Sequence, residues 1–340
     1  MSESAFLTEV AEHPAALRNL IQFYSGEGRT LLAQWKRLAG ESASVVFSGM
    51  GTSEFAAQMI IAELAAAGIN ALTIDAGELL HYPRPVNGML ILISQSGESI
   101  ETRTIADKMN GSVIVGAITN NGNSTIARIA EPVFLMCAGN EAAITTKTYV
   151  NTLAVLFLMA DRGDEESALN RLRELSDSIS EYDMDAIDRA AAGISDTEAI
   201  HFVSRGPAVV AAKQASLTFM EGARIAAAAF TGGAFRHGPF ETVGKEHRCV
   251  FFIPGGNTFH LLRDMALEIS EKGSRVVIIT DQDADNFSDS VHVLKVPEFG
   301  EDLFCLCAAP TQELLLHAVA GHRGISAGEF RYGNKITVRE

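Results

Sequence analysis

The hydrophobic pattern of the first half of the chain predicts short buried strands that alternate with helices. Residues 6–37 have apolar positions at helical spacing, and shorter, continuous apolar runs follow them. Continuous apolar runs that alternate with helical stretches are typical of a parallel sheet covered by helices on both faces. We therefore predict five strands, at 44–48, 71–74, 88–94, 112–118 and 132–136.

The second half of the chain repeats this pattern at a period of about 155 residues. Residues 161–193 are acidic, contain several arginines and have a helical pattern. Further strands are predicted after them, at 200–203, 249–253, 275–280 and 292–296. The fold class is therefore α/β, with two tandem doubly wound, flavodoxin-like parallel-sheet domains. We divide the chain into an N-terminal helical segment (1–36), a first α/β domain (37–163), connecting helices (164–194), a second α/β domain (195–329) and a C-terminal tail (330–340).

Composition narrows the classes of partner. The 340 residues carry a net charge of −15, which disfavours nucleic acid, because a basic surface is its usual footprint. The longest aliphatic run, 153–160, is far shorter than the roughly 20 residues of a membrane helix. The start of the chain has no signal-like stretch, so we expect a cytoplasmic protein. Four cysteines lie in or beside apolar runs and are expected to be buried thiols, with no metal or redox spacing among them.

Two loops of the first half have the composition of a ligand site. In open α/β sheets, ligands bind at the carboxyl ends of strands. Residues 49–53 (GMGTS) follow one predicted strand, and 94–99 (SQSGES) follow another. Hydroxyls and backbone N–H groups at a helix N-terminus form an anion site, although serine and glycine also simply cap helices. The corresponding loops of the second half, 204–206 and 255–258, lack this serine density, so we expect one phosphate site per chain.

These loops resemble the sugar isomerase (SIS) domain. The resemblance rests on the motifs GTS at 51–53, SQSGES at 94–99 and AGNE at 138–141, followed by Thr146 and Lys147. It extends through both halves and is strongest for the isomerase half of glucosamine-6-phosphate synthase (glutamine–fructose-6-phosphate aminotransferase). It implies a sugar 6-phosphate ligand and no metal or organic cofactor. The residues that it assigns to the phosphate site are Gly51, Thr52, Ser53, Ser94, Gln95, Ser96 and Ser99.

The resemblance also assigns three catalytic residues. Glu221 falls on the family's catalytic glutamate, which moves a proton between sugar C1 and C2. His237 falls on the histidine that assists ring opening, and Lys335, in the tail, falls on the lysine near the open-chain carbonyl. A buried carboxylate, a histidine and an amine suit these three tasks. Because the family's histidine reaches the active site of a neighbouring subunit, we expect a homodimer or larger assembly with a shared active site.

The sequence departs from the synthase in four places. The chain begins at its own Met1 without a glutaminase domain, so we do not expect it to draw ammonia from glutamine by itself. Gln214 replaces a glutamate and Thr218 replaces a lysine, and both share a helical face with Glu221. Ile144 and Asn334 are also expected to line the substrate pocket, although residues 141–146 form a stretch one residue shorter than in the synthase.

Loss of the charged pair at 214 and 218 favours a substrate with a group on its nitrogen. We therefore expect an enzyme that acts on an amino-sugar or ketosamine 6-phosphate and releases ammonia or an amine, as a deaminase or a deglycase. A simple aldose–ketose phosphosugar isomerase and a non-catalytic sugar-phosphate sensor are the alternatives. Turnover assays on a panel of sugar phosphates distinguish the enzyme from the sensor.

Overall fold

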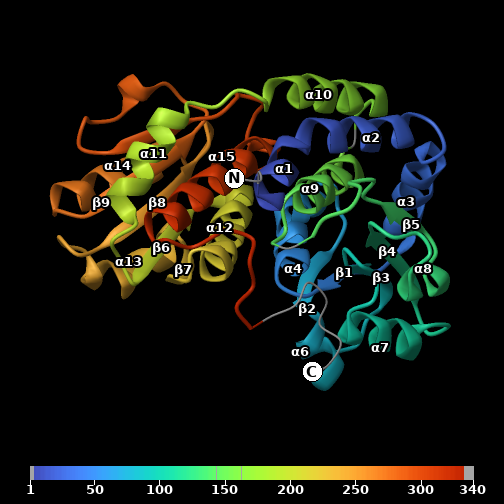
Figure 1. Ribbon diagram of the computed structural model, residues 1–340. Coiled ribbons are helices and arrows are strands. Elements are labelled where there is room, and N and C mark those ends of the chain that lie inside the picture. Colours follow the sequence, from blue (N-terminus) through green and yellow to red (C-terminus); the bar gives the residue numbers. More distant parts are fainter. Residues whose placement is uncertain (1–3, 143, 162, 333–340) are drawn as a thin grey trace. The chain divides into compact units, whose positions relative to one another are not determined.

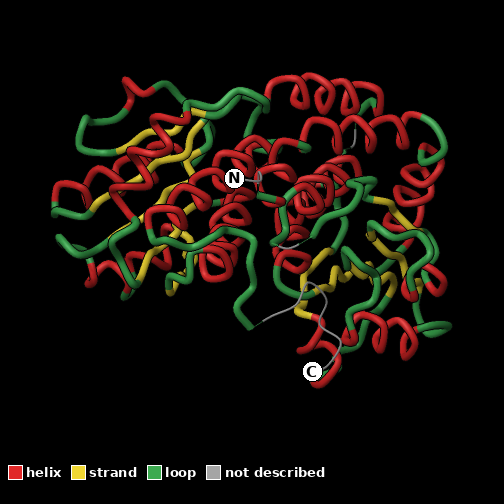
Figure 2. The backbone as a smooth tube through the Cα atoms, viewed as in Figure 1, coloured by secondary structure: helices red, strands yellow, loops and turns green. Residues whose placement is uncertain are grey.

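The computed structural model describes residues 4–142, 144–161 and 163–332, and it divides into two compact units, each built on one sheet. The first-sheet unit comprises Pro14–Glu141 and Lys147–Ser176. The second-sheet unit comprises the described residues up to His13, Ala142–Thr146, and the described residues from Asp177 on. Figure 2 shows the strands in two groups, each accompanied by helices, as the alternating pattern predicts.

The first sheet is parallel throughout, with the strand order β2-β1-β3-β4-β5. The central strand β3 is buried along almost its whole length, as expected for a sheet covered on both faces. Its apolar residues form a core with those of α6 and α7. The strands are β1 (Ser44–Gly49), β2 (Ala71–Asp75), β3 (Gly88–Ile93), β4 (Ile114–Thr119) and β5 (Val133–Leu135).

Helices cover this sheet (Figure 1). Helix α9 is buried along its entire length, and the Trp35 indole of α3 donates a hydrogen bond to the Met159 carbonyl near its end, at 2.7 Å. The helices of this unit are α2 (His13–Ser25), α3 (Arg29–Glu41), α4 (Thr52–Ala57), η1 (Gln58–Ile60), α5 (Ile61–Ala66), α6 (Ala76–His81), α7 (Ile100–Met109), α8 (Thr125–Ile129), α9 (Lys147–Ala160) and α10 (Glu165–Ser178).

The second sheet repeats the topology of the first. It is parallel, with the order β10-β9-β8-β6-β7, so β6 and β8 occupy the places of β1 and β3. The tandem doubly wound fold predicted from the sequence is confirmed. The strands are β6 (Ala199–Ser204), β7 (Ala226–Thr231), β8 (Arg248–Ile253), β9 (Arg275–Thr280) and β10 (His292–Lys295).

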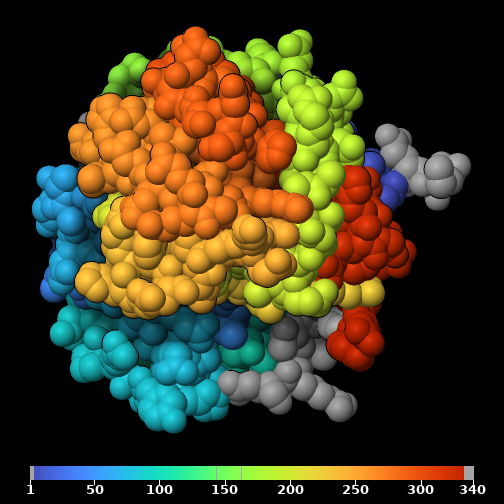
Figure 3. Space-filling view, turned by 90° about the vertical axis from the view of Figure 1, so that its left-hand side faces the viewer, coloured from blue at the N-terminus to red at the C-terminus, as the bar shows by residue number. Residues whose placement is uncertain are grey.

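Helix α15 organises the second-sheet unit. Nearly all of its residues are buried, and it packs against α11 and α12. On the face shown in Figure 3, the yellow-green α11 lies between the orange segments and the red α15. The helices of this unit are α1 (Ala5–Ala11), α11 (Met184–Ile194), η2 (Gly206–Ala208), α12 (Val209–Gly222), α13 (Gly232–Arg236), η3 (Pro239–Thr242), α14 (Phe259–Glu271), η4 (Ala284–Asn286) and α15 (Phe304–His322).

Two elements differ from the sequence prediction. Strand β7 is absent from the prediction because its sequence, AAAAFT, is rich in alanine, which favours helices. It lies at the edge of the sheet and is only partly buried, so it has no continuous run of large apolar residues. The helical stretch after β1 is divided into α4 and α5 by the 3-10 turn η1. None of the helices in the described ranges is long and apolar enough to cross a membrane.

Candidate functional site

The two predicted ligand loops lie at the point where the first sheet reverses its strand order. Strand β1 has β2 on one side and β3 on the other, and the loops leave the carboxyl ends of β1 and β3. Gly49 allows them to approach closely, since a Cβ there would lie 2.7 Å from both the Ile93 carbonyl oxygen and Ser53 Cβ. This switch point is the usual place for a ligand in an open α/β sheet.

The Ser94–Ser99 loop brings two of its hydroxyls, those of Ser94 and Ser99, close together. Ser94 Oγ accepts a hydrogen bond from the Gly97 N–H at 3.2 Å and lies 3.5 Å from Ser99 Oγ. Ser96 Oγ accepts from the Glu98 N–H at 3.1 Å. The turn requires Gly97 in the left-handed region, with φ of +66°. These hydrogen bonds hold the hydroxyls in a small area at the carboxyl edge of the sheet.

The side chain of Ser99 shows whether these serines only cap a helix. It occupies the N-cap position of α7, but its side chain makes no capping hydrogen bond. Its hydroxyl instead approaches Ser94 Oγ. Gln95, Ser96 and Ser99 are partly exposed, as are Gly51, Thr52 and Ser53 of the other loop. The arrangement therefore leaves hydroxyls within reach of a ligand beside the N-terminus of α7, where an anion is stabilised.

Glu98 anchors the serine loop, and the sequence reasoning did not single it out. Its carboxylate accepts hydrogen bonds from the Thr125 N–H at 2.7 Å and the Thr125 hydroxyl at 2.8 Å, and Arg103 lies 3.6 Å away. These hydrogen bonds, the backbone one above all, hold the pKa of Glu98 below its usual range. The negative charge is thus bound to the N-terminus of α8, and the serine loop is attached to the loop after β4. The sequence feature that could have identified Glu98 is an acidic residue inside a predicted anion-binding loop.

The same loop after β4 also fixes Gly97. A Cβ on Gly97 would lie 2.1 Å from Ser124 Oγ and 2.4 Å from Ser124 Cβ, so no larger residue fits. The Ile126 N–H donates to the Gly97 carbonyl at 3.3 Å, and the Asn120 N–H donates to the Gln95 carbonyl at 3.0 Å. The conformation of the serine loop is therefore determined by the neighbouring connection between β4 and α8, not by its own residues alone.

The proposed base lies in the second-sheet unit. Glu221 is in the last turn of α12 and is half-buried. Next to it, Gly222 packs against Ile144, whose Cδ1 would lie 3.0 Å from a Cβ at position 222. The structure therefore brings the predicted pocket residue Ile144 beside the helix turn that carries Glu221.

Gln214 and Thr218 lie in the interior of this unit. Each is about one per cent exposed. Thr218 Oγ1 donates to the Gln214 carbonyl at 3.0 Å and accepts a hydrogen bond from the Gln312 amide of α15, also at 3.0 Å. Neutral side chains suit this position, because a charged pair would need compensating partners there.

Of the remaining predicted catalytic and pocket residues, the structure describes only His237. His237 follows the short helix α13, where its N–H donates to the Ala234 carbonyl at 3.0 Å, and its side chain is exposed. Lys335 and Asn334 lie outside the described residues.

Metal-ligating residue types and two of the cysteines bear on alternative chemistry within the described residues. No group of three histidine, cysteine or acidic residues in the described ranges could hold a metal ion. Burial raises the pKa of the Cys137 thiol to about 11 and that of Cys305 to about 12. Neither is therefore a ready nucleophile at neutral pH.

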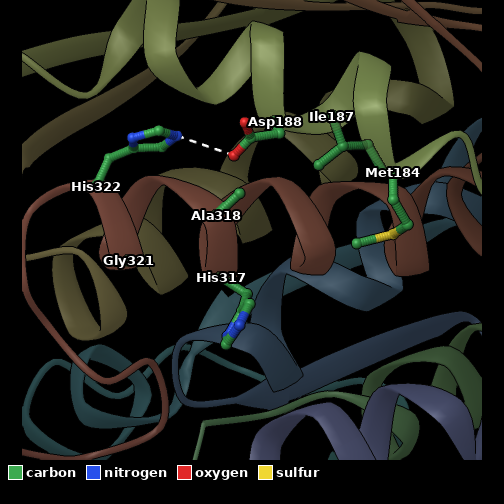
Figure 4. Close-up of a pocket in the computed structure, with 7 residues that line it drawn as sticks. All are labelled: Met184, Ile187, Asp188, His317, Ala318, Gly321 and His322. Atoms are coloured by element: carbon green, nitrogen blue, oxygen red, sulfur yellow. Dashed lines mark hydrogen bonds and ion pairs between the residues drawn. The ribbon is translucent and has the colours of Figure 1, made fainter.

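A surface cavity of about 440 Å³ lies between α11 and α15 of the second-sheet unit. Figure 4 shows His322 and Asp188 paired across these helices, at 3.0 Å. Among the residues that the structure describes, none of those predicted for the active site lines it. Its lining residues are Met184, Ile187, Asp188, His317, Ala318, Gly321 and His322.

Comparison with known proteins shows which relatives share this arrangement. The chain is 26% identical to a glutamine–fructose-6-phosphate aminotransferase (isomerizing) of Methanocaldococcus jannaschii over 332 residues, which are 94% of this chain and 29% of that protein. It is 24% identical to the aminotransferase of the same description from Pseudomonas putida, over 96% of this chain and 57% of that protein. The chain thus spans between about a third and just over half of the length of these curated relatives.

Solved structures show the same fold. The C-terminal domain of glucosamine-fructose-6-phosphate aminotransferase from Francisella tularensis has a TM-score of 0.83 at 20% identity, over 96% of this chain and 98% of that one. The glucosamine-6-phosphate deaminase of Thermotoga maritima has a TM-score of 0.76 at 19% identity, over 98% and 99%. The tagatose-6-phosphate ketose/aldose isomerase of Escherichia coli has a TM-score of 0.80 at 18% identity, over 95% and 94%.

A protein-family model described as "SIS domain" matches residues 38–162 and again residues 193–321, once for each sheet. The two matches together cover well over half of the chain and include both loops of the switch point as well as the helix of Glu221. With the strand order and the serine loop, they establish that the chain belongs to the SIS domain family.

Proposed function

We propose that this protein is a phosphosugar isomerase-type enzyme that acts on an amino-sugar or ketosamine 6-phosphate and releases ammonia or an amine. The observation that carries the proposal is the serine loop at the switch point of the first sheet, with its hydroxyls gathered beside the N-terminus of α7. The names of similar proteins support it, since they include aminotransferases of fructose 6-phosphate and a glucosamine-6-phosphate deaminase.

The first step is binding of the 6-phosphate. The hydroxyls of Ser53, Ser94, Ser96 and Ser99 donate to phosphate oxygens, and the N-terminal N–H groups of α7 stabilise its charge. Gln95, Gly51 and Thr52 complete the contacts. Glu98 keeps its carboxylate bound to Thr125, which lowers the repulsion that a free carboxylate would exert on a phosphate.

The second step is ring opening and proton transfer. His237 transfers the proton of the anomeric hydroxyl to the ring oxygen. The bond between the anomeric carbon and the ring oxygen breaks, which leaves an open-chain sugar with a free carbonyl. Glu221 removes a proton from the carbon beside the carbonyl or imine and returns it to the neighbouring carbon, so one base serves both positions. The shift converts the carbon–nitrogen bond to an imine, and water then hydrolyses the imine to a carbonyl and a free amine. Lys335 is the amine proposed near the open-chain carbonyl.

Between the two forms of the enzyme, we favour the deglycase. The face of α12 that precedes Glu221 carries the buried, neutral Gln214 and Thr218, and Thr218 is already bonded to Gln312. The loss of the charged pair at these positions suits a substrate whose nitrogen carries a substituent in place of hydrogen. A simple aldose–ketose isomerase uses the same base and remains the alternative, and a ketose/aldose isomerase is among the structures of the same fold.

We also propose that the active enzyme is at least a dimer. His237 is exposed on the described surface of its unit, as a residue that serves a neighbouring subunit must be. Size-exclusion chromatography with light scattering tests this proposal. A protein that is monomeric and fully active at assay concentrations would contradict it.

A product assay tests the reaction. The purified protein is incubated separately with glucosamine 6-phosphate, fructose-lysine 6-phosphate and fructose-asparagine 6-phosphate, and hexose 6-phosphates and ammonia are measured. Glucose 6-phosphate from a fructosamine establishes the deglycase, and fructose 6-phosphate with ammonia from the first substrate establishes the deaminase. Aldose–ketose exchange without release of nitrogen supports the isomerase. Binding of these compounds without any turnover would contradict an enzyme and favour a sensor.

A further inference from the structure

Arg205 occupies the switch point of the second sheet. It directly follows β6, which has β7 on one side and β8 on the other, so its place corresponds to that of the ligand loops in the first sheet. Its guanidinium lies over the start of α13. A Cβ on Gly232 would lie 2.7 Å from Arg205 Nε and 3.3 Å from Nη2, so only glycine leaves room for the guanidinium there.

Arg205 has no anionic partner within the described residues. Its Nε is shielded from water and makes no hydrogen bond there, and no carboxylate of the described chain forms an ion pair with its guanidinium. Two other arginines of this unit differ, because Arg248 pairs with Asp196 at 3.0 Å and Arg323 pairs with Glu198 at 3.2 Å. Arg205 as a whole is partly exposed, but a shielded donor of a charged group is costly unless it is bonded.

Two acidic residues lie at this edge of the sheet, and each has contacts with the loops beside it. The carboxylate of Glu301 lies against the two neighbouring loops, 3.2 Å from a Cβ on Gly206 and 2.9 Å from one on Gly256. Asp281 accepts the Gly255 N–H at 2.7 Å. The donors of Arg205 therefore remain available to a ligand from outside.

We infer that Arg205 is the centre of a second ligand site, which takes a small molecule bearing a phosphate or carboxylate group. A planar guanidinium binds either oxyanion through two parallel hydrogen bonds. One anion site per chain was predicted from the density of serines in the loops, and that criterion takes no account of arginine. Arg205 precedes α12, a helix of 14 residues, and Glu221 is at its far end, roughly 20 Å away. The site is therefore separate from the proposed base and suits an effector.

Titration calorimetry with two simple probes tests this site. The full chain carries Ser94→Ala and Ser99→Ala, which weaken anion binding at the serine loop, and is titrated with inorganic phosphate and with malonate. We expect one of the two to bind, and Arg205→Gln to weaken that binding at least tenfold. Binding of phosphate would indicate a phosphorylated effector. Binding of malonate would indicate an effector that bears a carboxylate group. If neither probe binds, or if Arg205→Gln leaves the affinity unchanged, the inference is wrong.

Two neighbouring glycines provide a matched control. Gly232→Ala forces the guanidinium to move, whereas the nearest atom to a Cβ on Gly233 is Arg205 Nη1 at 3.9 Å, which is ordinary contact. We expect Gly232→Ala to weaken probe binding about as much as Arg205→Gln, and Gly233→Ala to leave it unchanged. Thermal melts show whether each variant is folded. Equal affinities for the two folded glycine variants would contradict the assigned geometry.

Discussion

The two sheets share one topology and differ in what they place at the switch point. In the first sheet, the loop after β3 presents serine hydroxyls, and its acid, Glu98, is bound to Thr125. In the second sheet, the loop after β8 has its Gly255 N–H already bonded to Asp281, and an arginine follows β6. The topology therefore fixes where a ligand can bind, while the loop residues decide which ligand it is.

The proposed division of labour between the units gives the prediction with the largest effect. Glu221→Gln removes the base and keeps the shape, so we expect kcat to fall by about 10²- to 10⁴-fold. The serine loop is in the other unit, so the dissociation constant for the sugar phosphate, measured by calorimetry, should stay the same. Full turnover by the variant would exclude Glu221 as the base. A matched loss of binding would show that the two roles are not separable.

Gly97→Ala is expected to disrupt the first switch point alone. The new methyl would meet Ser124, and the residue would also keep a positive φ, so the serine loop must shift. A shift of about 1 Å in the loop should weaken sugar-phosphate binding by about 100-fold. Gly111→Ala is the matched control, since its φ is +77° and a Cβ there meets nothing within 4 Å. It should cost roughly 1 kcal/mol of stability and leave binding intact. Equal binding by both variants would contradict the assigned loop geometry.

A histidine pair should make the second-sheet unit more sensitive to acid than the first. His201 Nδ1 lies 2.9 Å from His247 Nε2, and burial first, then His201 and Arg248, lowers the pKa of His247 to about 4. The unfolded chain takes up the proton near pH 6.5, so stability is retained above that pH and falls as the pH decreases toward 4. Between pH 7 and pH 5 the loss should be about 2 kcal/mol.

Hydrogen exchange at the two pH values measures this loss for each unit separately. Protection of β6 and β8 should decrease at pH 5, and the decrease should be smaller in His247→Gln, whose amide does not titrate. Equal sensitivity of β1 and β3, or an unchanged pH response in the variant, would remove the histidine pair as the cause.

The smallest effect is expected from single hydroxyls, and it distinguishes the two loops. Ser99→Ala removes one donor to the phosphate and should weaken binding about tenfold, the equivalent of one hydrogen bond to a charged group. Thr258 holds the corresponding N-cap position before α14 in the second sheet and, like Ser99, makes no capping hydrogen bond. Thr258→Ala should therefore leave sugar-phosphate affinity unchanged. An equal loss in both variants would place sugar phosphate at both switch points.

The sequence was sufficient for the fold wherever large apolar residues formed the strands. It failed at β7, where tertiary pairing with β6 overrides the helical preference of an alanine run. It also located the serine loop, because hydroxyl density at a strand end is a local signal. The residues that hold this loop could not be predicted from the sequence, since Ser124 and Thr125 contact Gly97 and Glu98 only after the sheet has formed. Arg205 was likewise unremarkable until the fold showed that it has no anionic partner among the residues that the structure describes.

Hydrogen exchange with and without saturating fructose 6-phosphate tests the central claim, the sugar-phosphate site at the first switch point, most directly. We expect the ligand to slow exchange in residues 51–53 and 94–99, with no change in residues 255–258. Protection confined to the second-sheet loops, or no protection in the serine loop at saturation, would contradict the site.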